Sequence, residues 1–347
     1  MKNYWFKRLL LIPVTLFGIM ALNFALIQIT PGGPVEHMLL KLQSTNSGTE
    51  AATVTDSRQK ALSEQLRTEL NKQFGFDKPV IERFGKMLKD YATFNFGKSF
   101  YQDKTVLGLI KEKMPVSLSL GIFSTLFIYL LAIPLGIKKA TRAGSHFDKT
   151  TTLVLTLAYA MPAFLLAIFL VIVFAGGHYL SWFPLRGLTS DNWQELTWFG
   201  KVTDYLWHIT LPVLSISLGG IASLCFLTRN SFLDELNKPY VLTAKAKGCS
   251  ETRYLWGHIF RNAMLLVLAG FPAMLISMLF TGSMLIEIIF SLDGLGLLGY
   301  EALQNRDYPV VFGSLYLFSL LGLILNVLSD FIYTLVDPRI HFRSRRQ

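Results

Sequence analysis

Long apolar stretches alternate with shorter polar segments along this chain. Six of the apolar stretches contain no Asp, Glu, Lys or Arg over at least 20 residues. A helix needs about 20 apolar residues to cross about 30 Å of bilayer hydrocarbon, so each stretch predicts a membrane span rather than part of a large soluble core. The predicted spans are Leu9–Ile29, Val116–Ile137, Thr150–Ala175, Ile209–Thr228, Asn262–Ile286 and Val310–Ser329.

This pattern predicts an all-α, polytopic membrane protein with six transmembrane helices. The first stretch could instead be a signal peptide, because Lys2, Lys7 and Arg8 precede its apolar run. Its 21 residues exceed the usual apolar core of a signal peptide, and the segment 30–33 does not resemble a cleavage site. An uncleaved span is therefore the preferred interpretation.

Composition agrees with a membrane protein. Hydrophobic residues make up 52% of the 347 positions and charged residues 16%, whereas a soluble domain carries about 25% charged residues. Two cysteines exclude a disulfide scaffold and a cysteine-rich zinc module. The remaining question is why the net charge is +10.

Lys and Arg are distributed unevenly between the polar segments: 17 flank the spans on one side, and three lie in the short loops on the other. Cytoplasmic loops carry the positive excess, so both termini are predicted to be cytoplasmic. The net charge then reflects orientation among membrane lipids, and no nucleic-acid partner is expected. The 17 lie before Leu9, in 138–149, in 229–261 and after Ser329; the three lie in 176–208 and 287–309.

The long segment 30–115 is predicted to lie outside the membrane. Residues 44–55 are rich in Ser, Thr and Gly and are typical of a flexible stretch. Two amphipathic helices are predicted after it, the second beginning near Pro79. Their role stays open between a structural lid and a docking surface for an external partner. Their apolar faces carry Leu62, Leu66, Leu70 and Phe74, and then Ile81, Phe84, Leu88 and Tyr91.

Residues 92–99 fit a relaxed phosphate-binding-loop pattern that ends in Gly97-Lys98-Ser99. Such a loop needs a preceding buried strand and a glycine-rich turn. Here Ala92 replaces the first glycine, and the interior holds Phe94 and Phe96. No nucleotide site is therefore predicted, and no cofactor is expected to bind this chain.

The predicted spans exclude several function classes. Their lack of ionisable residues argues against a proton-coupled secondary transporter. The chain lacks an H-E-x-x-H motif and has no evident Ser/His pair in the spans, so a membrane enzyme is not favoured. Prolines and glycines can bend spans around a gated path, although ordinary packing irregularity explains them equally well. Candidate path residues are Pro162, Pro272, Ser277 and Thr281.

The loop between the fourth and fifth predicted spans carries the clearest local signals. Pro239 suits the first position of a short helix, and Gly248 suits a left-handed residue just after its end. Ser250 can cap a second helix, with Glu251 in its first turn. Pushing the first helix would move the two spans on either side of it. A basic helix lying on the membrane surface is the competing interpretation.

The composition of this short helix suits close contact with a partner. Ala244, Ala246 and Gly248 are small and permit close approach, while Lys245 and Lys247 add positive charge. Both cysteines fall toward the predicted cytoplasmic side, where a disulfide is not expected.

The sequence Thr243-Ala-Lys-Ala-Lys-Gly248 followed by Arg261-Asn262-Ala263 resembles the EAA loop of binding-protein-dependent ABC importer permeases, in the dipeptide and oligopeptide branch. Other motifs agree in order along the chain. With Trp182–Gly187 and Trp207–Pro212, the chain is most similar to the first permease subunit of Yej-type importers, which are associated with oligopeptides and microcin C. The other motifs are Pro31–Pro34, Phe96–Ser99, Phe290–Gly296, Arg306–Val310 and Asp330–Ile340.

The resemblance implies a type I ABC importer permease fold and several partners. These are a homologous second permease, a cytoplasmic ABC ATPase that holds ATP and Mg²⁺, an extracytoplasmic peptide-binding protein and a peptide substrate. This subunit would be a non-catalytic half of the channel, located in a bacterial inner membrane. The loop would form the coupling helix on the ATPase, through Tyr240, Thr243, Ala244, Lys245, Ala246, Lys247, Gly248 and Glu251.

The same resemblance suggests an organisation into parts. Two positions depart from the family pattern: Leu242-Thr243-Ala244 replaces Glu-Ala-Ala, and Leu266 replaces a proline near the start of the fifth span. The runner-up function is an ATP-independent channel or secondary transporter. The parts are an N-terminal transmembrane helix (1–29), an extracytoplasmic helical segment (30–115), a five-helix core with its coupling loop (116–340 and 229–261) and a basic tail (341–347).

Overall fold

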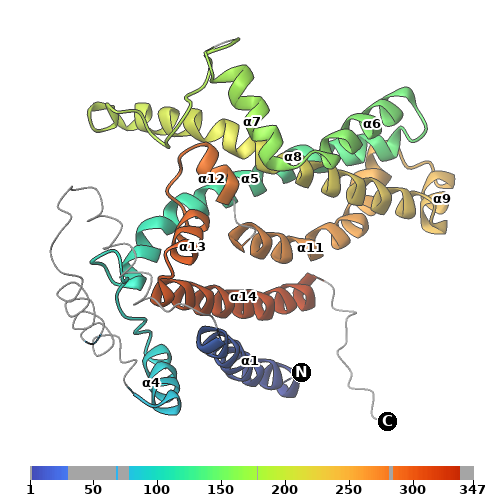
Figure 1. The fold of residues 1–347 in the computed structure, drawn as a ribbon. Helices are drawn as coiled ribbons and strands as arrows, with labels where there is room; N and C mark the ends of the chain where they lie inside the picture. Colours follow the sequence, from blue (N-terminus) through green and yellow to red (C-terminus); the bar gives the residue numbers. More distant parts are fainter. Residues whose placement is uncertain (1, 30–67, 69–77, 178, 281–283, 337–347) are drawn as a thin grey trace. The chain divides into compact units, whose positions relative to one another are not determined.

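A computed structural model describes most of the chain as helices (Figure 1). The regular structure of the described residues is helical apart from one isolated bridge between Lys98 and Thr105, so the all-α prediction is confirmed. The chain forms two compact units, one from residues 1–112 with 298–323 and one from residues 113–297 with 324–347. The described residues are 2–29, 68, 78–177, 179–280 and 284–336.

The helices vary widely in length, from four residues to 39. A short 3₁₀ turn, Trp193–Glu195, precedes α8, and a π-helical turn, Leu255–Ile259, joins α10 to α11. The α-helices are α1 Lys2–Ile29, α4 Val80–Ala92, α5 Val106–Thr141, α6 His146–Ala160, α7 Ala163–Phe174, α8 Trp198–Leu236, α9 Pro239–Ala246, α10 Glu251–Tyr254, α11 Phe260–Phe280, α12 Met284–Ile289, α13 Leu295–Gln304 and α14 Tyr308–Val336.

Four described helices are long and apolar enough to cross a membrane: α1, α5, α8 and α14. The count rises to five if α6 and α7, which are bent by 101° at the break between them, form one span. The prediction of six spans is therefore not confirmed. The remaining predicted span, Asn262–Ile286, begins within α11, and part of it lies outside the described residues.

Prolines within the predicted spans differ in their effect on the helices. Met161 has extended backbone angles, φ −83° and ψ 122°, and Pro162 then starts α7 in a new direction. A residue before proline is disfavoured in the helical region, which accounts for the break. Pro134 and Pro212 instead lie inside α5 and α8 without ending them. The stretch Thr150–Ala175, predicted as a single span, is therefore two helices.

The unit formed by residues 113–297 and 324–347 is held together where glycines let α5 and α8 approach closely. A Cβ on Gly136 would lie 2.7 Å from Thr228 Cβ, and one on Gly220 would lie 2.5 Å from Ile128 Cδ1. Larger residues would force the two backbones apart. Buried apolar residues of α5, α8 and α11 form the core beside this contact, including Ala132, Ala222, Phe232 and Val267.

The other unit contains α1 and α4 with an aromatic cluster. Phe84 of α4 packs between Phe17 and Phe24 of α1, at ring distances of 5.9 and 5.1 Å. Tyr91, Phe96 and Tyr316 are mutually in contact. The helix predicted after Pro79 is thus present as α4. The helix predicted around 62–74 lies outside the described residues, apart from residue 68. Helix α4 ends at Ala92, so residues 93–99 follow a helix rather than the strand that a phosphate-binding loop needs.

Candidate functional site

The candidate site is α9, the short helix that follows α8. Pro239 occupies the first turn of α9, as predicted, where its missing N–H costs no helical hydrogen bond. Lys238 precedes it in an extended conformation. The chain therefore turns sharply at the end of α8 and starts a separate eight-residue helix.

Gly248 ends this helix in the left-handed conformation that the sequence predicts, with φ +76°. Its N–H donates to the carbonyl of Lys245 at 2.9 Å, and the N–H of Cys249 donates to the carbonyl of Ala244 at 3.1 Å. This pair of bonds is a Schellman motif, which satisfies the last carbonyls of a helix. The end of α9 is consequently fixed by its own backbone.

The predicted cap by Ser250 is only half present. Ser250 lies at the N-cap of α10 with an extended backbone, but its side chain makes no capping hydrogen bond there. The N–H groups of Arg253 and Tyr254 donate to its carbonyl instead. Glu251 occupies the first turn, as predicted.

One side of α9 is buried and the other is exposed. Val241 is fully buried at 0% exposure and belongs to the core of α5, α8 and α11. Its neighbour Leu242 is 64% exposed, although it is apolar. Among the predicted coupling residues, Tyr240 and Ala244 are half-buried, and Thr243, Lys245, Ala246, Lys247, Gly248 and Glu251 are exposed. The structure thus gathers this set around one small surface.

Polar contacts tie α9 to both neighbouring long helices. The Tyr240 hydroxyl donates to Glu235 Oε2 of α8 at 2.6 Å, and Lys238 pairs with the same carboxylate. Asn262 Nδ2 of α11 donates to the Tyr240 hydroxyl at 3.4 Å. Burial, with Glu235 beside it, raises the pKa of Tyr240, so the hydroxyl stays a donor at neutral pH. Displacing α9 would therefore pull on α8 and α11 together.

The segment after α9 adds two further links. Lys245 Nζ lies 5.1 Å from the ring centre of Tyr254, which joins α9 to α10. Ser231 Oγ of α8 donates to the carbonyl of Ala263 in α11 at 2.8 Å. The π-helical turn at Leu255–Ile259 lies at the entry to α11, and such turns are frequent at functional sites.

Sequence reasoning missed Glu235 as the residue that holds α9 in place. Its spacing of three residues from Lys238 is a helical ion-pair signal that could have identified it. The candidate path residues stay a prediction: Pro162 lies exposed at the α6–α7 break, the side chains of Pro272 and Ser277 are not described, and Thr281 lies outside the described residues. Within the described part of the chain, no group of three or more His, Cys, Asp or Glu could hold a metal ion.

Comparison with known proteins identifies a family for this chain. A family model described as "Binding-protein-dependent transport system inner membrane component" matches residues 132–342, a range that includes α9.

Relatives match over almost the whole chain. An inner membrane ABC transporter permease protein, YejB of Escherichia coli O157:H7, is 53% identical, with 99% of this chain and 100% of the relative covered. A peptidoglycan transport system permease protein, also named YejB, from Agrobacterium fabrum is 49% identical over the same shares. The oligopeptide transport system permease protein AppB of Bacillus subtilis is 31% identical, again with 99% and 100% covered.

Proposed function

The chain belongs to the family of inner membrane components of binding-protein-dependent transport systems, and we propose that it forms one half of the channel of an ATP-driven peptide importer. The other half would be a homologous second permease. A cytoplasmic ABC ATPase would hold ATP and Mg²⁺, and an extracytoplasmic binding protein would deliver the peptide. This chain itself would carry out no covalent chemistry.

The observation that carries this proposal is the exposed face of α9. A helix whose one side is locked to α8 and α11 and whose other side presents Leu242, Ala246 and Gly248 suits docking by a partner protein. An autonomous channel or secondary transporter would have no need for such a surface, and the family membership does not favour either of them. We assign the ATPase contact to Tyr240, Thr243–Gly248 and Glu251.

The proposed importer works by alternating access between inward-open and outward-open states. Closure of the ATPase would displace α9, and α8 and α11 would follow because both are bonded to it. The excess of Lys and Arg on one side of the spans supports a cytoplasmic location for α9 and both termini. The multi-pass inner membrane location follows from the family and from the apolar helices.

We propose oligopeptides as the substrate class. The names of the relatives specify oligopeptide transport in one case and peptidoglycan transport in another, and both cargoes contain peptide. A microcin C-like peptide is included in the proposal through the Yej-type resemblance. Uptake of labelled oligopeptides by the reconstituted importer, with muropeptides and microcin C as competitors, separates the three.

The docking assignment is tested with Gly248→Val and a matched control, Gly177→Val. Both glycines have a left-handed backbone, φ +76° and +74°, and a Cβ at either meets no atom within 4 Å. The backbone strain is therefore equal, about 1–2 kcal/mol. Gly248→Val should abolish peptide uptake and release the ATPase on purification, because the valine stands in the contact. Gly177→Val, on the predicted outer side, should retain both.

A second substitution removes backbone strain from the test. Leu242→Arg changes an exposed apolar side chain of α9 and leaves Val241 in the core. It should likewise release the ATPase while the second permease remains bound. Normal uptake and ATPase binding in both α9 variants would contradict the docking assignment, as would an equal loss in Gly177→Val.

A further inference from the structure

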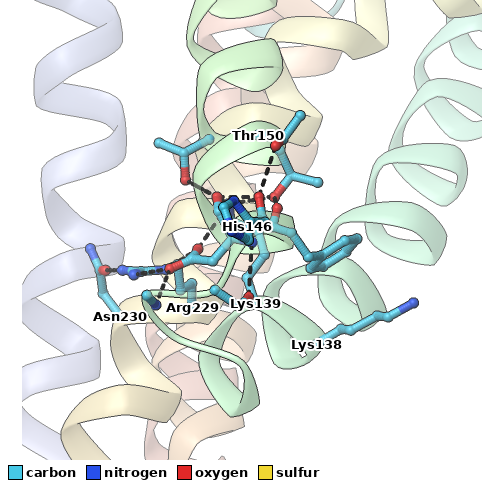
Figure 2. Close-up of polar contacts among 12 residues, drawn as sticks. Lys138, Lys139, His146, Thr150, Arg229 and Asn230 are labelled. Carbon is cyan, nitrogen blue, oxygen red and sulfur yellow. Dashed lines mark hydrogen bonds and ion pairs between the residues drawn. The ribbon is translucent and has the colours of Figure 1, made fainter.

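A buried ionic cluster connects three helices in the unit that contains α9 (Figure 2). Asp148, in the first turn of α6, is 4% exposed, and Lys139, near the end of α5, is fully buried. Lys139 Nζ donates to Thr151 Oγ1 at 2.8 Å, to Thr152 Oγ1 at 2.7 Å and to the Asp148 carbonyl at 2.9 Å. These bonds lock α5 to α6. Lys138, its neighbour, points away from the cluster.

Arg229 connects the same cluster to α8. Its Nε donates to Asp148 Oδ1 at 2.9 Å and its Nη2 to Oδ2 at 2.7 Å, which is a bidentate pair. The Gly144 N–H also donates to Oδ2, at 3.1 Å, so the turn between α5 and α6 is included. A bidentate Arg–carboxylate pair fixes both distance and orientation, unlike an apolar contact that can slide.

Arg229 lies close to the part of α8 that holds α9. Glu235, which binds Tyr240 of α9, is six positions further along the helix, or about 9 Å at 1.5 Å per residue. Ser231, which binds the Ala263 carbonyl of α11, lies between them. One short stretch of α8 therefore contacts α6, α9 and α11 through specific polar bonds. Figure 1 shows α6 and α9 at the same end of α8.

We propose that the Asp148–Arg229 pair is the joint that transmits displacement of α9, through α8, to the α5–α6 hairpin. Asp148 and Arg229 are then positioning residues for coupling. They touch neither peptide nor ATP, and they act only through the helices α6 and α8 that they join. Lys139 has a separate task, since it holds the hairpin itself together. This inference rests on the proposed docking of an ATPase on α9.

The cluster offers substitutions that leave Asp148 paired. Arg229→Gln removes the bond to α8 and leaves Asp148 with Lys139, 3.1 Å away. Lys139→Met removes an equal charge but keeps the bond to α8. Arg142→Gln removes an exposed positive charge from the same turn and serves as the control.

The test measures peptide transported per ATP hydrolysed in the reconstituted complex of both permeases, the ATPase and the binding protein. Arg229→Gln should lower this ratio about fivefold to tenfold, within the range of ordinary coupling factors, while the ATPase stays bound and active. The ratio for Arg229→Lys should lie between those of the wild type and Arg229→Gln, because a lysine keeps the charge but cannot make the bidentate bond. Lys139→Met and Arg142→Gln should keep the wild-type ratio.

Spin labels provide a readout that a merely stabilising pair would not change. Labels replace the exposed residues Lys149 on α6 and Asp234 on α8. In the otherwise unaltered complex the distance between them should be the same with and without trapped ATP, because the two helices move together. In Arg229→Gln the distance should differ between the two states.

The outcomes separate the joint from the docking proposal. An unchanged transport ratio in Arg229→Gln, an equal decrease in Lys139→Met, or a parallel loss of uptake and ATP hydrolysis would each overturn the joint. A label distance that already changes in the unaltered complex would overturn it as well. Failure of the docking proposal gives a different result, since no ATPase would then copurify with the unaltered chain.

Discussion

Two aspartates of this chain are equally buried but have different partners. Asp148 and Asp307 are each 4% exposed. Asp148 bonds to the side chains of Arg229 and Lys139. Asp307 accepts hydrogen bonds from the hydroxyl of Ser99 and from the backbone N–H groups of Phe100 and Val310. The first site is built from charges, and the second from neutral donors.

This difference separates two uses of a buried carboxylate. At Asp148 the negative charge is required, because the fully buried Lys139 would otherwise face the interior uncompensated. At Asp307 the charge is a cost: burial outweighs the hydrogen bonds and raises the pKa of that carboxyl. Asp148 therefore acts as an ionic connection between helices, and Asp307 as an acceptor that orders the backbone at 99–102.

Asp148→Asn should have the largest effect on stability. The amide cannot neutralise Lys139, whose side chain is fully buried, so the local free energy of unfolding should fall by about 3–5 kcal/mol. Hydrogen exchange of the Gly144 amide, which bonds to Asp148 Oδ2, measures the loss directly. Adding Lys139→Met should recover most of it, because Arg229 is partly exposed and can be hydrated. If the double variant did not recover local stability, the unpaired charge of Lys139 would not be the cause of the loss.

Lys139→Met alone should cost less, about 2 kcal/mol. Asp148 keeps its bidentate bond to Arg229, and Met fills the space of the lysine stem. The hydroxyls of Thr151 and Thr152 still donate to the carbonyls of Phe147 and Asp148, both at 2.6 Å. The rate of amide hydrogen exchange across the first turn of α6 should rise by less than in Asp148→Asn. An equal rise would mean that Asp148 and Lys139 contribute equally to local stability.

Ser99→Ala tests the neutral site and should cost about 1 kcal/mol. The Ser99 hydroxyl donates to Asp307 and accepts from the N–H groups of Tyr101 and Gln102, at 3.2 and 2.9 Å. Water can replace part of this network because Gln102 is exposed. Faster exchange should be confined to residues 99–102, and Ser119→Ala on α5 is the matched control.

Local rules were enough to predict parts of the candidate site. Pro239 and Gly248 mark the start and end of α9 because their backbone preferences are intrinsic to the residue. Thr150–Ala175 was predicted as one span, so the 101° bend at Pro162 was missed. A proline alone does not specify such a bend, because Pro134 and Pro212 lie inside continuous helices. The same residue type thus gives different results in different tertiary surroundings.

Contacts between distant residues were beyond the sequence. The pattern Ser145-His-Phe-Asp148 matches a helix-capping signal, and Ser145 Oγ does accept from the Asp148 N–H at 3.3 Å. Nothing in that pattern specifies that Arg229, 81 positions away, completes the site. Likewise the motifs around Ser99 and Asp307 were noted separately, and only the structure joins them.

Asp307→Asn should have the smallest effect, and in the opposite direction to Asp148→Asn. Its amide oxygen can accept from Phe100 and its NH₂ can donate to Ser99, so removing the charge should leave local stability unchanged or raise it by up to about 0.5 kcal/mol.

The pH dependence of local stability in the wild-type protein tests whether the charge of Asp307 is the cause. Because the folded-state pKa of Asp307 is raised, its contribution to stability is fully present below the ordinary Asp pKa of about 3.9 and is lost as the pH rises through the raised value. The ratio of Phe100 amide exchange between wild type and Asp307→Asn, measured in that window, isolates this step from other titrating groups. A wild-type site that grows more stable than the Asn variant as the pH rises would mean that Asp307, like Asp148, is held by positive charge.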